Sequence, residues 1–588
     1  MPLSRDVSGK LAQEGHVTGL VGLSSEYTLE IIPSLTVIER GHGIRALSSS
    51  NPAAPESRRF VNAPAKADPG LSIKLTLSSD VTLDFAANPD FAQVEADQPV
   101  VTANERFPIF FAEKRPFFLE GIDIFQTPLQ MAHTRTIVDP DYAVKLTGKH
   151  GRNTFGILLA SDRAPGNFTE EERSDPALFP SIERFVDKNA YIGVLRYKRD
   201  LGKESSLGFM GTTYNFIENH NHAVALDGRF RVNQQTFFSF QLAGTTSRTF
   251  FFDPDRGTDL YRDGKGFGYF WNYDRTARHF NYRLSGSGQT ADYRAGVGFT
   301  RRTNHNSTSL AARYDSEPNP RARLVSWSVG NESRISNDWQ GRVQDSESAP
   351  SVTFNFSNQT SLTALGFFGF EKVYEEEFGP KRTATRRGAF IGDSSERSAQ
   401  YRGADFTFNT APSKKFSAAI RTFRGWGILD YDLGGGPRYP RASPGALIDP
   451  GAPLDPGPGG QWFLKLTFTL QPTDELRTSI DYTKSRLTRR DTGLVAFDSN
   501  ILSSRTTYQF TRFTFARVRL DFDSGRSNVL GQFLLGWTPS PGTSFYAGYN
   551  DDLNYNGFSP LTGRREPGLQ RNNRTFFIKM AYLFRRNL

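Results

Sequence analysis

From residue 141 to its end, the chain alternates hydrophobic and polar side chains with a period of two. The run Ala516–Asp523 places charged residues on one face and apolar residues on the other, namely Ala516, Val518, Leu520 and Phe522. Successive side chains of a β-strand point to opposite faces, so this rhythm predicts strands with one apolar and one ionic side. The same alternation recurs in Gln235–Ala243, Asp292–Thr300, Gly403–Asn409, Trp462–Leu470, Arg477–Lys484 and Asn528–Trp537.

The gaps between these runs are of two kinds. Asp200–Lys203 and Thr538–Thr543 are tight, whereas Ser161–Asp187, Tyr374–Ser398 and Leu433–Gly460 are long and polar. Short turns at one rim and long loops at the other are typical of outer-membrane barrels. The pattern predicts an all-β fold, a large closed antiparallel transmembrane β-barrel of about 20 strands within a range of roughly 16 to 26. A soluble β-rich protein with two stacked sheets would also alternate and is the competing interpretation.

The last strand of the chain strengthens the membrane interpretation. Thr575–Phe584 presents an unbroken apolar face made of Phe576, Ile578, Met580, Tyr582 and Phe584. We interpret this face as the barrel-assembly signal of a bacterial outer-membrane protein, although four residues follow Phe584. Apolar runs such as Phe155–Ala160 are far shorter than the ~20 residues of a spanning helix, whereas a closed barrel pairs its backbone groups between strands.

Composition and charge exclude several classes of protein. Lys+Arg 71 against Asp+Glu 62 gives a net charge of +9, and the basic residues form no run that would mark a nucleic-acid arm. The chain contains no cysteine, which excludes zinc–cysteine sites, thiol catalysis and disulfides. The first residues lack an apolar core and include Asp6 and Glu14, so they are no signal peptide. We therefore expect the chain to begin inside a longer precursor of an outer-membrane protein.

One stretch, Asn88–Phe125, breaks the rhythm. It holds ten charged residues and seven phenylalanines in no strict period. We expect the barrel to enclose it, so residues 1–87 form an N-terminal segment with the first barrel strands, including a hairpin of Leu71–Leu77 and Val81–Ala86. Residues 88–140 form a charged, aromatic segment that plugs or caps the lumen, and residues 141–588 form the rest of the barrel.

Two strings of this stretch, NPDFAQVEADQ from Asn88 and EKRPFFLEG from Glu113, resemble a family of bacterial proteins of unknown function, DUF5916. Its members carry a large C-terminal β-barrel, often behind a sandwich that resembles the family 9 carbohydrate-binding module. That module is missing here, with at most a remnant before residue 70, so its sugar binding is not carried over. The resemblance covers most of the chain, and Ala112 stands where members commonly have proline. The expected plug and family-motif residues are Asn88, Pro89, Asp90, Phe91, Gln93, Glu95, Asp97, Glu113, Lys114, Arg115, Pro116, Phe117, Phe118, Glu120 and Gly121.

Three constellations suggest chemistry, and each has a plainer interpretation that we favour. Glu95 with Asp97, or Glu113 with Glu120, match the two acids that a glycosidase needs, but a charged lumen contains ion-paired carboxylates anyway. His220 and His222 share one side of a strand without a third metal ligand nearby. Asp253, Asp255 and Asp259, like Asp551 and Asp552, match calcium-loop composition without the helix–loop–helix pattern. We therefore expect no catalytic residue, no metal and no cofactor.

The sequence thus predicts an outer-membrane barrel for transport, for gating, or as a scaffold for a periplasmic or surface partner. The alternative is a surface-exposed glycan-acting hydrolase or a carbohydrate-binding protein on a barrel scaffold. Expected partners are outer-membrane lipid, the barrel-assembly machinery, and either a carbohydrate or a periplasmic protein.

Overall fold

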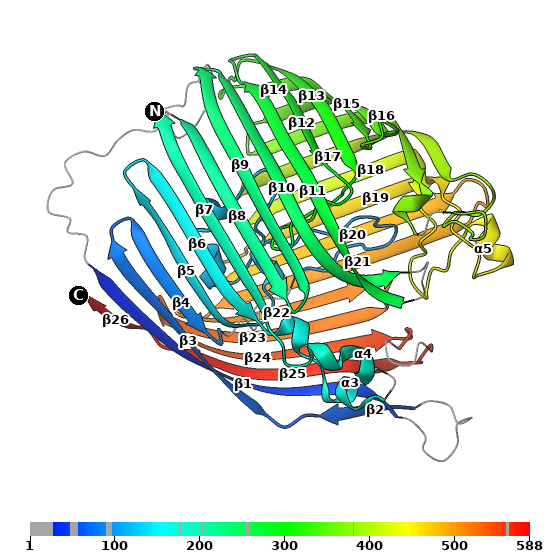
Figure 1. The fold of residues 1–588 in the computed structure, drawn as a ribbon. Helices are drawn as coiled ribbons and strands as arrows, with labels where there is room; N and C mark the ends of the chain where they lie inside the picture. Colours follow the sequence, from blue (N-terminus) through cyan, green and yellow to red (C-terminus); the bar gives the residue numbers. More distant parts are fainter. Residues whose placement is uncertain are drawn as a thin grey trace.

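The computed structural model describes residues 27–46, 57–89, 97–176, 178–202, 204–253, 258–379, 382–559 and 564–587. Nearly all regular structure belongs to one antiparallel sheet (Figure 1). Its strands are β1 (Thr28–Ala46), β2 (Ser57–Asn62), β3 (Lys66–Ser78), β4 (Val81–Ala87), β5 (Pro140–His150), β6 (Asn153–Asp162), β7 (Ala190–Gly202), β8 (Ser205–Phe216), β9 (Asn219–Asn233), β10 (Thr236–Asp253), β11 (Thr258–Arg275), β12 (Phe280–Gln289), β13 (His305–Asp315), β14 (Leu324–Asn337), β15 (Val343–Phe356), β16 (Thr360–Tyr374), β17 (Glu396–Ser413), β18 (Phe416–Asp430), β19 (Gly457–Leu470), β20 (Leu476–Arg489), β21 (Val495–Gln509), β22 (Thr514–Asp523), β23 (Asn528–Ser540), β24 (Thr543–Tyr555), β25 (Leu569–Ala581) and β26 (Phe584–Asn587).

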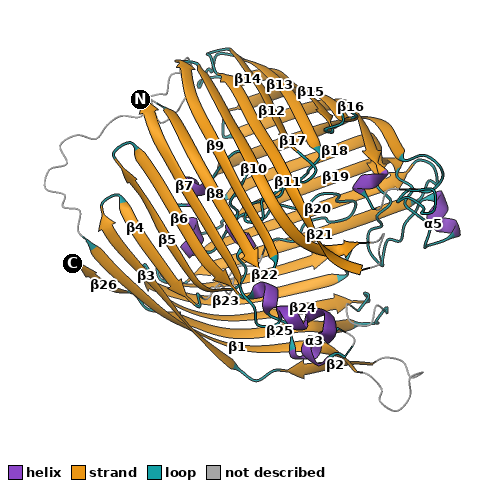
Figure 2. Ribbon diagram, viewed as in Figure 1, coloured by secondary structure: helices purple, strands orange, loops and turns teal. Residues whose placement is uncertain are grey.

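The helices are short and lie in the connections between strands (Figure 2). The α-helices are α1 (Pro116–Leu119), α2 (Ile122–Phe125), α3 (Glu170–Ser174), α4 (Phe179–Ile182) and α5 (Pro444–Ile448). Single turns of 3-10 helix are η2 (Thr134–Thr136), η3 (Ala164–Gly166), η4 (Glu183–Phe185) and η5 (Glu375–Glu377). Among the helices that the structure describes, none is long and apolar enough to cross a membrane.

The sheet closes on itself through β1. One edge of β1 pairs with β3, and the other edge pairs with β25, where Val37 lies opposite Ile578. β2 continues β3 along the first edge, and β26 continues β25 along the second. The ring therefore contains 24 strands, an even number within the expected range and above the central expectation of about 20. Two stacked sheets would leave edges unpaired, so the soluble sandwich is excluded.

The two rims of the ring differ as the gaps predicted. Tight turns such as Ser79–Asp80 and Pro541–Gly542 lie at one rim, here called the short-turn rim. The start of β1 and the end of β26 also lie at this rim, where Thr28 pairs with Asn587. The opposite long-loop rim carries α3, α4 and α5 (Figures 1 and 2). The predicted hairpin of Leu71–Leu77 and Val81–Ala86 is confirmed as β3 and β4.

The outer face of the ring is apolar. On β22, Val518 is 41% exposed and Leu520 54%, whereas the alternate residues Arg519 and Asp521 face inward with 4% each. The terminal strand obeys the same rule: Phe576, Met580, Tyr582 and Phe584 are exposed, and Ile578 is half-buried. A closed, even-stranded barrel with apolar residues outside is the architecture of bacterial outer-membrane proteins. The outer-membrane location predicted from the sequence is confirmed.

One predicted strand is wrong. Residues 290–304, which include Asp292–Thr300, form no strand and fold back between β12 and β13. Tyr293, Ala295 and Val297 do share a face, but that face is buried in a core inside the ring. An alternating run cannot by itself distinguish a wall strand from an extended segment that packs on a neighbour.

Candidate functional site

The insert, residues 88–139, leaves the wall where β4 ends and returns at β5. Figure 1 shows it crossing the interior of the ring. In the motif EKRPFFLEG, Pro116 begins α1, where its missing N–H costs no hydrogen bond. Gly121 then joins α1 to α2 with a φ of 68°, and a Cβ there would lie 3.3 Å from the Thr147 side chain of β5. The left-handed backbone and the close wall both favour glycine at this turn.

One side of the insert packs against an apolar sector of the inner wall. The insert contributes Phe118, Phe125, Leu129, Met131 and Ile137. Strands β5 to β10 contribute Ala143, Leu158, Ala160, Ile192, Val194, Met210, Ala223, Ala225 and Ala243. The expected ionic inner face is therefore wrong in this sector. Small inward side chains leave room for the phenylalanines of the insert, as close packing requires.

Polar anchors fasten the same side. Lys145 on β5 is 2% exposed, and its Nζ donates to the carbonyl oxygens of Phe117 at 2.6 Å and Glu120 at 2.8 Å. Its ammonium also lies 3.2 Å from the Asp84 carboxylate on β4. Farther along, the Leu129 N–H donates to Oε1 of Gln241 on β10 at 2.8 Å. Buried polar groups that are paired in this way fix the position of the insert rather than destabilise it.

Within the insert, Glu113 and Arg115 form a buried centre. Arg115 donates to Glu113 from Nε at 2.9 Å and from Nη2 at 2.7 Å, and also to the carbonyl oxygens of Thr134 and Ile137 at 2.6 Å each. Burial alone would raise the pKa of Glu113, but the hydrogen bonds from Arg115 and from the Thr134 hydroxyl outweigh it and lower the pKa to about 2. Glu113 is therefore a fixed anion that joins the middle of the insert to its C-terminal part.

The other side of the insert meets the wall through charges. Arg106, whose side chain is 7% exposed, pairs with Glu377 of η5 and lies 3.8 Å from Glu371 on β16. Its guanidinium also lies over the rings of Phe378 at 5.0 Å and Tyr431 at 5.7 Å. Next to it, Nδ2 of Asn104 donates to the Leu429 carbonyl at 2.9 Å, and Oδ1 accepts from the Tyr431 N–H at 2.8 Å. The insert thus also grips the wall around β16 and β18.

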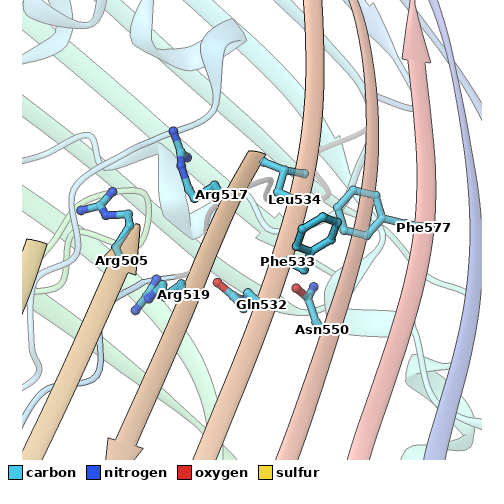
Figure 3. A pocket seen from close by; sticks show the side chains of 8 residues that line it. All are labelled: Arg505, Arg517, Arg519, Gln532, Phe533, Leu534, Asn550 and Phe577. Atoms are coloured by element: carbon cyan, nitrogen blue, oxygen red, sulfur yellow. The ribbon is translucent and has the colours of Figure 1, made fainter. Parts of the chain in front are cut away.

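Asp97 links the insert to a third region of the wall. Its side chain pairs with Lys114 and Arg135, and these hydrogen bonds outweigh burial to lower its pKa. Its carbonyl oxygen accepts from Nη2 of Arg519 on β22 at 3.0 Å. Figure 3 shows Arg519 with Arg505 and Arg517 beside a cavity of about 20 Å³, room for one water molecule. Arg505 and Arg519 stand directly opposite each other in the strand register.

Between the insert and strands β12 to β18 the lumen remains open. This chamber, of about 1050 Å³, is lined by charged and aromatic side chains that point inward. Among its aromatic residues are Phe107 of the insert and Phe367, Tyr401 and Phe423 of the wall. The insert therefore divides the lumen into a packed sector and a hydrated one.

The structure brings together most of the residues that the motif suggested. Nδ2 of Asn88 donates to Oδ1 of Asp68 at 2.8 Å, and its Oδ1 accepts from Arg163 at 2.9 Å, which fixes the start of the insert at the wall. Phe117 packs edge-on against Phe118 at 5.1 Å, and Glu120 pairs with Lys74 of β3. Pro89 ends the described residues before the gap. Asp90, Phe91, Gln93 and Glu95 lie outside the described residues.

The competing chemical interpretations gain no support. Glu113 is clamped by Arg115 and Glu120 is bound by Lys74, so each of these two carboxylates has a cationic partner of its own. His220 and His222 stack at 5.3 Å, and the described residues hold no group of three metal-ligating side chains. Asp551 accepts from Arg571 and Asp552 from Asn573, while Asp255 lies outside the described residues.

Sequence reasoning missed the wall residues that receive the insert. Lys145, Gln241 and Arg196 are buried polar residues at inward positions of otherwise ordinary strands. Arg196 donates from Nε to the Ile124 carbonyl at 3.3 Å and pairs with Asp227. The signal was weak but present: Lys145 is the one charged residue within the apolar run Tyr142–Leu146.

Comparisons with known proteins find one similar family, over part of the chain. A family model described as "Domain of unknown function (DUF5916)" matches residues 56–137. This range covers β2 to β4 and nearly all of the insert, a smaller part of the chain than the resemblance implied. No curated protein matches the chain.

Several solved structures are similar to this chain in the path of the backbone. The siderophore receptor PirA from Pseudomonas aeruginosa matches with 10% identity and a TM-score of 0.44, over 94% of this chain and 80% of that one. The copper transporter OprC matches with 10% identity and a TM-score of 0.48, over 95% and 81%. The FrpB iron transporter from Neisseria meningitidis matches with 12% identity and a TM-score of 0.42, over 75% and 78%. The match at residues 56–137 confirms the resemblance seen in the motifs: this part of the chain is similar to the DUF5916 family.

Proposed function

We propose that this outer-membrane barrel is a gated passage and that residues 88–140 are its plug. In this proposal residues 1–87 and 141–588 form the wall around it. Bacterial barrels keep short turns on the periplasmic side, so the short-turn rim faces the periplasm and the long-loop rim faces outward. The terminal strand, with Phe576 to Phe584 outside, serves as the signal read by the barrel-assembly machinery.

The observation that carries the proposal is that the insert contacts distant sectors of the ring at once. It is anchored to β5 through Lys145 and to β10 through Gln241, and on the other side to β16 through Arg106 and to β22 through Asp97. A segment held from several sides obstructs the lumen. The two sides are held differently, by apolar packing against β5 to β10 and by ion pairs near β16.

This asymmetry supports a gate rather than a permanent stopper. Ion pairs and hydrogen bonds exchange partners with water and ligands, whereas a dry apolar core resists opening. The ionic side borders the hydrated chamber, so a shift there would widen an existing space. We therefore place the moving part of the plug at Asn104–Phe107 and its fixed part at Phe118–Ile137.

The test compares single-channel conductance of the purified protein in planar bilayers. Arg106→Ala removes the charged contact to Glu371 and Glu377 and is expected to increase conductance or the frequency of opening. The matched control is Arg313→Ala, which removes an arginine whose side chain is 60% exposed and paired with Asp315. Equal, steady and large conductance in the wild type and in Arg106→Ala would refute the plug.

A further inference from the structure

The chamber between the insert and β12 to β18 has a wall surface that is unusual for a water-filled pore. Three inward aromatic rings lie flat against the sheet, each covering a glycine. A Cβ added at Gly403 would lie 2.2 Å from Cζ of Phe367, one at Gly425 2.8 Å from Cζ of Phe423, and one at Gly369 2.6 Å from the Tyr401 ring. The missing side chains thus allow the rings to lie along the wall instead of projecting into the lumen.

The three rings form a continuous patch across β16, β17 and β18. The ring centroids of Phe367 and Phe423 lie 5.2 Å apart and those of Phe367 and Tyr401 lie 6.2 Å apart, with interplanar angles of 21° and 42°. Phe367 is buried at 8% exposure, while Phe423 and Tyr401 are half-buried and line the chamber. Rings that lie flat on a wall offer their faces to whatever occupies the space beside them.

The charged groups around this patch compensate one another. Arg421 pairs with Asp405 at 2.7 Å, and Arg334 pairs with Asp345 at 3.3 Å. The Tyr401 hydroxyl donates to Oε2 of Glu347 at 2.9 Å. The two arginine side chains remain 59% and 45% exposed, so they keep donors directed at the chamber while their charge is balanced.

The chemistry of such a surface selects a class of ligand. Balanced ion pairs give no net attraction for an anion or a cation. Their guanidinium groups still offer hydrogen-bond donors, and their carboxylates offer acceptors. Aromatic faces favour a ligand with a flat apolar side. A purely apolar ligand would leave the charged groups desolvated without partners, which is costly.

We infer that the chamber binds an uncharged, hydroxyl-rich oligosaccharide, with the apolar faces of its sugar rings on Phe423 and Tyr401 and its hydroxyls on the Arg421–Asp405 and Arg334–Asp345 pairs. A volume of about 1050 Å³ lies just above the roughly 300–1,000 Å³ that is usual for ligand pockets, which suits several linked rings. The inference rests on the proposed function, because a ligand in this chamber stands on the path through the barrel.

The test is a binding titration of the full protein in detergent with four neutral probes, namely maltohexaose, cellohexaose, xylohexaose and hexa-N-acetylchitohexaose. Hexagalacturonate is the charged comparator. At least one neutral probe is expected to bind, and its Kd is expected to be at least tenfold lower than that of hexagalacturonate. Phe423→Leu is expected to raise that Kd at least tenfold.

The matched control is Phe577→Leu on β25. Phe577 also faces inward and covers a glycine, since a Cβ at Gly548 would lie 2.2 Å from its Cζ, but it does not line the chamber. Both variants lose the same kind of packing, so a purely structural role for the rings predicts equal effects. The heat-modifiable band of each variant shows whether the barrel has folded.

Three results would overturn the inference: no neutral probe binds, the charged probe binds more tightly, or the two leucine variants weaken binding equally. The proposed function is judged separately. If Arg106→Ala opens the pore and no hexaose binds, the gate stands and the oligosaccharide chamber fails. If a hexaose binds and conductance never responds to Arg106→Ala, the chamber stands and the gate fails.

Discussion

The buried pair Lys145–Asp84 gives the sharpest test of how the insert is held. Lys145→Met removes the ammonium that lies 3.2 Å from the Asp84 carboxylate and that donates to the carbonyl oxygens of Phe117 and Glu120. Both side chains are nearly sealed from solvent, with 2% and 8% exposed. Leaving one charge of a buried pair without its partner costs about 3–5 kcal/mol.

The chain offers a clean way to measure that cost. It contains no cysteine, so Ala132→Cys introduces a single thiol at a position that packs against the apolar core of the insert. The rate at which a maleimide labels this thiol follows the fraction of molecules with the insert undocked. At about 1.4 kcal/mol per tenfold, Lys145→Met should speed labelling by roughly a hundredfold to a few thousandfold.

A double-mutant cycle tests the reasoning behind the number. Asp84→Asn removes the stranded charge, so the double variant should label more slowly than Lys145→Met alone, and the full cycle should give a coupling energy of about 0.5–3 kcal/mol. The control is Lys149→Met on the same strand, whose partner Asp200 lies 2.8 Å away at side-chain exposures of 56% and 31%. A surface pair of this kind contributes at most about 1 kcal/mol. If the double variant labels as fast as Lys145→Met, the ion pair does not hold the insert.

Three further predictions follow from other contacts. Because hydrogen bonds lower the pKa of Glu113 to about 2, its stabilising contribution is complete above its ordinary value of 4.5 and is lost as pH falls toward 2. The labelling rate of Ala132→Cys, divided at each pH by the rate of a freely exposed thiol, should therefore rise across this window by the equivalent of at most about 3 kcal/mol. In Glu113→Gln this normalised rate should already be high at neutral pH and should lack the acid step. Gly403→Ala should lower the melting temperature, since its Cβ would lie 2.2 Å from the Arg424 carbonyl oxygen and from the Phe367 ring. The control Gly244→Ala, whose Cβ would have no atom within 4 Å, should leave the melting temperature unchanged. Equal melting temperatures of the two variants would contradict the close packing at Gly403. Leu520 lies on the outer face at 54% exposure, and Leu520→Arg should destabilise the barrel in lipid vesicles by about 2–4 kcal/mol if this position lies near the membrane midplane. Urea unfolding measures this loss of stability. An unchanged stability would place Leu520 away from lipid.

The wall of the barrel could be predicted in outline from residues near one another in the sequence. Val518, Leu520 and Phe522 alternate with Arg519 and Asp521, and the structure places the first set outside and the second inside. The same rule placed the faces of the terminal strand correctly. Strand count was harder, because several wall strands, such as β14 with its four scattered serines, alternate too weakly to be recognised.

The site could be predicted only as a stretch of sequence. The motif around Glu113 marked the insert. The wall residues that bind the insert are ordinary in sequence, and they meet it only because the ring closes. Alanines such as Ala223 and Ala225 say nothing about which face is buried, because alanine is compatible with lipid, with water and with a packed core. Asp292–Thr300 looked like a strand because its apolar residues alternate, and alternation does not show whether an apolar face meets lipid or a packed core.

By itself the sequence determined a two-faced strand wall that must close into a ring, and one aromatic, charged stretch that does not belong to that wall. Both follow from local periodicity, since neighbouring side chains on a strand point to opposite faces. The tertiary structure alone decided that β5 to β10 pack against the insert with an apolar surface and that ion pairs hold it near β16. It alone also decided that a chamber lined by Phe367, Tyr401 and Phe423 remains between the insert and the wall. Those arrangements join residues between 28 positions apart, as for Lys145 and Phe117, and 422 positions apart, as for Arg519 and Asp97, and the closure of the ring brings them together.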